Sequence, residues 1–159
     1  MTGPPRDARV LSIIRYALLA LVALGTAGMV TELMLIGHHE DANQLIPLWV
    51  AAAGLLSLVA VAIRPSVGTL RLLQFVMLAY LGTGVIGITL HFKANAEFQR
   101  EIDPSLGGLA LFWKVVEATA PPALAPGVMV QLGLLGLVYT YKHPALNEQD
   151  FHADRKDIR

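Results

Sequence analysis

Long apolar stretches, separated by short polar segments, set the pattern of this 159-residue chain. Four stretches are long enough to cross a lipid bilayer as a helix, which takes about 17–25 apolar residues. They cover residues 11–37, 46–63, 70–91 and 123–141. Because lipid cannot satisfy open backbone groups and no alternating strand pattern is present, we expect the spans to be helical. The sequence therefore predicts an all-α integral membrane protein with four transmembrane helices in a bundle.

The segment between the third and fourth spans, residues 92–122, is long for such a small chain. Asp103 followed by Pro104 favours a helix start, with Asp as the N-cap and Pro at the first helical position. Apolar residues then recur at helical spacing through Trp113 and Val116. Since this part is too short to span a membrane, we expect a short amphipathic helix on the outer surface or over the bundle.

Positive charge predicts the orientation, because cytoplasmic segments of membrane proteins are rich in Lys and Arg. With residues 1–10 inside, the cytoplasmic segments hold Arg6, Arg9, Arg15, Arg64, Arg71, Lys142, Arg155, Lys156 and Arg159. The opposite side holds Lys93, Arg100 and Lys114. Both termini, including the tail at 142–159, are therefore expected in the cytoplasm, and the membrane is expected to be an inner, cytoplasmic one.

Composition agrees with a membrane protein and narrows the partners. The chain is 55% hydrophobic and 15% charged, whereas soluble domains are about 25% charged. It has no cysteine, which excludes disulfides, thiolate metal sites and c-type haem attachment. Its formal net charge is zero, so no overall positive field favours nucleic acid. The expected partners are membrane lipid and other membrane helices.

The second and fourth spans share a pattern that suggests an internal repeat. One contains GLLSLV and the other GLLGLV, and each motif begins seven residues after a proline, Pro47 or Pro126. At the outer ends of the first and third spans, HEDAN (39–43) echoes HFKAN (91–95). This pattern is consistent with two helical hairpins of common origin, as in membrane proteins built from parallel repeats. Chance similarity between apolar helices is the competing interpretation.

Two glycine-bearing helix faces are candidates for close packing, because residues three or four apart share a face. The glycines are Gly25 and Gly28 on the first span and Gly84 and Gly87 on the third. Small residues let helix backbones approach closely in membranes. We expect these two faces to meet.

The residues that could carry chemistry lie near the outer ends of the first and third spans. Contact between the glycine faces would bring His39 and His91 together, with Glu32 about 10 Å deeper at 1.5 Å per residue. An ionisable residue within a span is costly against lipid, so Glu32 is either a structural pairing partner or a functional group.

With His38, these side chains could bind a divalent metal, and the pair His39 and His91 could instead bind haem b. The alternative is that Glu32, His38, His39 and His91 only solvate helix ends, since no repeated ligand spacing is present.

Two functions remain open from the sequence. No nucleophile–base pair, phosphate loop or dinucleotide motif is present, which makes an enzyme the least supported class. The first function is a non-enzymatic accessory or scaffolding subunit that packs in a homo-oligomer or a larger membrane complex. The alternative is a metal- or proton-binding membrane protein, used in transport or sensing or as a small b-type cytochrome.

Overall fold

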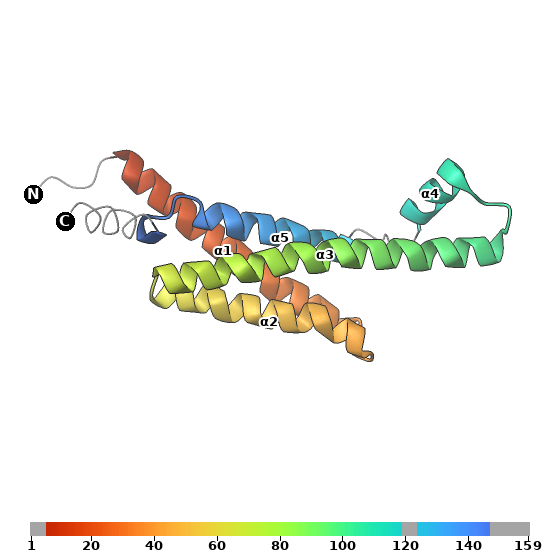
Figure 1. The fold of residues 1–159 in the computed structure, drawn as a ribbon, viewed down its shortest axis with the longest axis horizontal. Helices are drawn as coiled ribbons and strands as arrows, with labels where there is room; N and C mark the ends of the chain where they lie inside the picture. The colour runs from red at the N-terminus through yellow and green to blue at the C-terminus, as the bar shows by residue number, and fades with distance from the viewer. Residues whose placement is uncertain (1–5, 119–123, 147–159) are drawn as a thin grey trace, which may run out of the picture.

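The computed structural model describes residues 6–118 and 124–146, and these residues form helices joined by short connections (Figure 1). The helices are α1 (Arg6–Leu35), α2 (Ala42–Ile63), α3 (Val67–Ile102), α4 (Gly108–Val116) and α5 (Leu124–Thr140). Residues 1–5, 119–123 and 147–159 lie outside the described part. They include half of the predicted N-terminal segment and most of the predicted cytoplasmic tail.

Among the described residues, α1, α2 and α3 are each long and apolar enough to cross a membrane. α5 is a shorter apolar helix of 17 residues, which makes it about 26 Å long at 1.5 Å per residue. The hydrocarbon core of a bilayer is about 30 Å thick. The chain is thus helical and has the composition of a membrane protein, while the fourth crossing, by α5, stays a prediction.

The long helices pack in a ring. α2 and α5 each contact both α1 and α3, and the contact between α3 and α5 is the most extensive. α1 and α3 therefore lie across the ring from each other, with α5 and α2 between them. This corrects the expectation that the glycine faces of the first and third spans meet.

A tight connection joins α2 to α3. Pro65 follows the last residues of α2 and cannot continue the helical hydrogen bonding. Ser66 then caps α3: its side chain accepts from the backbone N–H of Thr69 at 3.3 Å, and the Thr69 hydroxyl accepts from the Ser66 N–H at 2.9 Å. This reciprocal cap satisfies two N–H groups that would otherwise lack partners, so the two helices can reverse direction within three residues.

The middle of the bundle is closely packed around Tyr80 of α3, which is fully buried. Its hydroxyl can donate to the carbonyl of Ala51 at 3.3 Å or to the Thr26 hydroxyl at 3.4 Å. α2 and α5 approach α3 closely here because they carry glycines. A Cβ on Gly54 would overlap the Tyr80 hydroxyl, and one on Gly133 would lie 2.9 Å from the carbonyl oxygen of Met77.

α3 continues about three turns beyond residue 91, where the apolar stretch ends. The extension reads FKANAEFQREI and is rich in good helix formers, with a Lys93–Glu97 pair at 3.8 Å. The third helix is therefore longer than its predicted span. The end of an apolar segment marks where the chain leaves lipid for water, and a helix can continue beyond that point.

The expected helix start at Asp103 is also corrected. Asp103 is the C-cap of α3, and its carboxylate accepts from the backbone N–H and the hydroxyl of Ser105 at 2.9 and 2.6 Å. The short helix predicted in this loop does exist as α4, but it begins at Gly108.

α4 folds back along the extension of α3, and the two form an arm that projects beyond the other helices (Figure 1). Leu111 and Val115 are buried against Ala96, and the rings of Phe92 and Phe112 lie 5.9 Å apart. The apolar positions predicted for this helix, among them Trp113 and Val116, are mostly exposed. α4 is therefore apolar on more than one side.

Candidate ligand-binding cavity

A cavity of about 560 Å³ lies where the C-terminal end of α1, the start of α2, the middle of α3 and the start of α5 come together. We call this region the histidine end. Aliphatic and thioether side chains make up most of its wall, among them Leu33, Ile46, Ile86, Leu90 and Met129. A mainly apolar cavity of this size with a few polar groups is the usual form of a small-molecule site.

The turn after α1 places His38 at this cavity. Gly37 has a φ of 70°, which only glycine adopts without strain. The N–H of His38 donates to the carbonyl of Leu33 at 2.9 Å, and the N–H of Gly37 donates to that of Met34 at 3.2 Å. This is the Schellman pattern that ends a helix and reverses the chain, and it leaves His38 partly buried while His39 is exposed.

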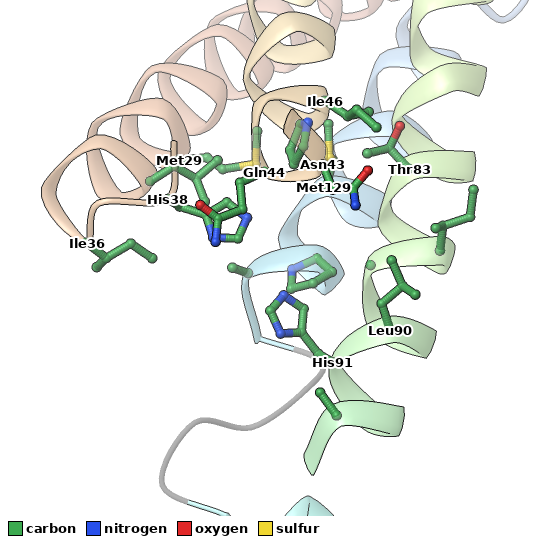
Figure 2. Close-up of a pocket in the computed structure, with 17 residues that line it drawn as sticks. Met29, Ile36, His38, Asn43, Gln44, Ile46, Thr83, Leu90, His91 and Met129 are labelled. Atoms are coloured by element: carbon green, nitrogen blue, oxygen red, sulfur yellow. The ribbon is translucent and has the colours of Figure 1, made fainter. Parts of the chain in front are cut away.

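His38, and not the predicted His39, is the partner of His91 on α3. The two imidazole rings lie 6.3 Å apart, centroid to centroid, and are 29° from parallel. Figure 2 shows His38 on the α1–α2 side of the cavity and His91 on the α3 side. Burial lowers the pKa of His38 from its ordinary value of 6.5, and the charge of His91 lowers it further. The neutral imidazole is therefore favoured at His38.

Gln44 supplies a further polar group, and the cap of α2 fixes it. Asp41 is the N-cap, and the side-chain oxygen of Gln44 accepts from the backbone N–H groups of Glu40 and Asp41 at 2.9 and 3.3 Å. Because the oxygen is held in the cap, the amide nitrogen is the atom that can donate to a ligand. Gln44 lines the cavity beside Asn43, on the same side as His38 (Figure 2).

The cavity is open and not sealed. Ile46 of α2 is 51% exposed, and Ile86 and Leu90 of α3 are 60% and 58% exposed, although all three line it. These residues belong to helices long and apolar enough to lie in lipid. The opening is thus bordered by aliphatic side chains of α2 and α3, together with the exposed polar residues Asn43 and His91. Among the described residues that line it, none is Lys, Arg, Asp or Glu.

The four-residue metal site suggested by the sequence gains no support. Glu32 and His39 are both exposed, away from the cavity that His38 and His91 line. Among the described residues, no group of three or more His, Asp or Glu side chains is placed to hold one ion.

Three of the four glycines predicted to pack the first span against the third lie against α5 instead. A Cβ on Gly25 would lie 2.6 Å from Leu132, one on Gly84 would lie 2.7 Å from the carbonyl oxygen of Pro126, and one on Gly87 would lie 3.0 Å from the Pro126 ring. A Cβ on Gly28 would meet nothing within 4 Å. Three of the four glycines therefore bring a helix close to α5, and Gly28 does not.

The suggested internal repeat stays a prediction. Its two matched prolines, Pro47 and Pro126, both line the cavity. However, HEDAN spans the turn before α2 and the first two residues of that helix, whereas HFKAN lies inside α3.

Two features of the site were not predicted from the sequence. The Asp41–Gln44 spacing is a visible capping-box pattern, so the fixed position of Gln44 was open to prediction. The contribution of Pro126 and Met129 was not, because it depends on how α5 packs against α3. Comparisons with protein-family models, with curated proteins and with solved structures find no match to this chain.

Proposed function

We propose that this protein is a membrane-embedded binding protein for a lipid-soluble small molecule, which enters the cavity sideways from the bilayer. The observation that carries the proposal is the cavity of about 560 Å³, bordered by the exposed aliphatic residues Ile46, Ile86 and Leu90. A ligand dissolved in lipid would exchange one apolar environment for another there. The polar groups at the rim, His38, His91 and Gln44, would select its head.

The positive charges support an orientation with the histidine end outside. Within the described residues, the end opposite the cavity carries Arg6, Arg9, Arg15, Arg64, Arg71 and Lys142. α3 beyond the cavity and α4 carry Lys93, Arg100 and Lys114. The positive-inside rule then places both termini in the cytoplasm and the cavity in the outer half of the bilayer.

Photo-crosslinking with a long-chain alcohol that carries an alkyl diazirine tests the proposal. With protein in nanodiscs, we expect adducts on the lining segments 43–47, 83–91 and 125–129, and excess unlabelled alcohol should suppress them. Ala125→Phe should reduce these adducts because Ala125 lines the cavity. Ala53→Phe, at an exposed position outside the lining, is the matched control. Labelling that does not saturate and is equal along α2 and α3 would contradict the proposal.

A second candidate is the accessory or scaffolding subunit expected from the sequence, and the arm favours it. Phe98, Ile102, Leu109 and Trp113 are each more than half exposed on the arm, which extends beyond the other helices (Figure 1). Scattered exposed apolar residues are normal, but a contiguous patch marks an interaction site. If the arm binds a partner in a membrane complex, Trp113→Glu should abolish copurification of that partner. A monomer without partners in native membranes would exclude this role.

A further inference from the structure

The polar groups of the cavity restrict the head of the ligand, if the proposed function holds. Gln44 can present its amide N–H groups, because its oxygen is held by the cap of α2. An imidazole has at least one N–H donor, and both His38 and His91 line the cavity. The head is therefore expected to carry hydrogen-bond acceptors, such as carbonyl oxygens.

The electrostatic surroundings favour a neutral head. No Lys or Arg among the described residues lines the cavity, so a carboxylate or a phosphate would find no permanently charged cation there. The acids Glu40 and Asp41 lie in the same turn as His38, and like charges near an anion raise its free energy. Burying an unpaired charge is unfavourable, which disfavours fatty acids, phospholipid head groups and the propionates of haem.

The histidine pair favours a flat head. The centroids of the His38 and His91 rings lie 6.3 Å apart, and the ring planes are 29° from parallel. One flat ring in contact with both imidazoles needs about 7 Å, which is two carbon contact distances of about 3.5 Å. The two imidazoles would therefore have to move apart and become more nearly parallel to admit such a ring. The aliphatic cavity beyond the pair would hold a long apolar tail.

Membrane quinones combine these properties: a neutral flat ring, two carbonyl acceptors and a long hydrocarbon tail. We infer that the cavity binds a membrane quinone, with its ring between His38 and His91 and one carbonyl accepting a hydrogen bond from Gln44. This inference rests on the proposed function and adds the class of ligand to it.

Binding of three probes with the same tail length tests the inference: decyl-ubiquinone, decanol and decanoate, titrated by calorimetry into the purified, lipid-exchanged protein. We expect decyl-ubiquinone to bind about tenfold more tightly than decanol or more, since one to two hydrogen bonds and ring contacts are added. Decanoate is expected to bind most weakly of the three.

Three variants locate the head. Gln44→Glu keeps a capping-box residue at its position but removes the amide donor and adds a negative charge, so decyl-ubiquinone affinity should fall about tenfold or more. His91→Leu should lower it by a similar factor, and His91→Phe by less, because a flat ring remains. His39→Leu, at the exposed neighbouring histidine, should leave it unchanged. Affinity for decanol should change little in all of them.

The outcomes separate the two proposals. Equal affinities for decyl-ubiquinone and decanol would overturn the quinone inference and leave the lipid-soluble ligand standing, whereas no saturable binding of either would overturn both. Tightest binding of decanoate would replace the neutral head by an anionic one. A Soret absorption band in protein from haem-replete cells, lost in His91→Leu and kept in His39→Leu, would assign the histidine pair to haem and overturn the quinone.

Discussion

The middle of the bundle and its histidine end are built from the same helices, yet one is filled and the other is hollow. Around Tyr80, glycines on α2 and α5 bring their backbones against α3, and no room is left for a methyl group at Gly54. At the histidine end Pro47 of α2 and Pro126 of α5 line a cavity of about 560 Å³. In the repeat-like pattern each proline lies seven residues, or about two turns, before its glycine. Along α2 and α5 the glycines thus lie in the filled part of the bundle, and the prolines lie at the cavity.

The largest effect is expected from filling the packed region. Gly54→Ala would place a methyl group on the buried Tyr80 hydroxyl, and the ring would have to leave its site. We expect a loss of about 3 kcal/mol in the free energy of unfolding, measured by denaturation in detergent. Gly28→Ala, where a Cβ meets nothing, is the control and should be neutral or stabilising by about 0.5–1 kcal/mol. Similar losses in both variants would refute the close-packing explanation.

An intermediate effect is expected at the turn that places His38. Gly37→Ala forces an L side chain to a φ of 70°, at a cost of about 1–2 kcal/mol, and should also weaken ligand binding because His38 moves. Gly37→Asn is the matched variant, since Asn tolerates this backbone conformation better. If the two variants bind ligand equally weakly, the backbone conformation is not what positions His38.

A smaller loss is expected from Tyr80→Phe, which keeps the ring and removes the hydroxyl that bonds Ala51 or Thr26. We expect about 1 kcal/mol of lost stability, with no change in affinity for a neutral alkyl probe. Thermal unfolding and the crosslinking assay measure the two quantities. A strong loss of binding would show that the packed region and the cavity are coupled.

The smallest effect is expected from pH at the histidine end. Because the pKa of His38 is lowered in the folded protein, by burial first and by His91 second, the folded state binds fewer protons than an opened turn does. The contribution of His38 to stability is complete above pH 6.5 and is lost as the pH falls below that ordinary value.

When the pH is lowered from about 7.5 to about 5.5, hydrogen exchange of the turn at 36–41 should therefore be faster than the intrinsic pH dependence of amide exchange predicts. No such excess is expected around Tyr80. His38→Asn should remove the effect. Equal acceleration in both regions would attribute the change to the whole bundle.

Much of the fold could be predicted from the sequence, because length and hydropathy determine membrane helices. The four apolar stretches correspond to α1, α2, α3 and α5 within a few residues, except at the end of α3. That end was misplaced because residues 92–102 are polar but still favour a helix. The helix propensity of the residues stays high beyond the point where the apolar stretch ends.

The site was predicted less well. The sequence pointed to histidines at the ends of the first and third spans, and His91 does face a histidine. The partner was misassigned, because helical spacing was continued through Gly37, where the chain in fact reverses. The predicted contact between the glycine faces was wrong for another reason. Helical periodicity tells which residues share a face, but not which helix lies opposite that face. That depends on the ring order, in which α5 separates α1 from α3.

The most direct test of the central claim is whether the cavity exchanges with lipid or with water. The chain has no cysteine, so a nitroxide label can be placed at Thr83→Cys, which lines the cavity, and at Ala53→Cys, an exposed control outside it. Collision rates with oxygen, which concentrates in lipid, are then compared with those of a water-soluble nickel chelate by electron paramagnetic resonance. We predict oxygen access and little nickel access at residue 83, with oxygen access reduced by decyl-ubiquinone or decanol and no such reduction at residue 53. Strong nickel access at residue 83, unaffected by these ligands, would show a water-filled cavity and contradict binding from the bilayer.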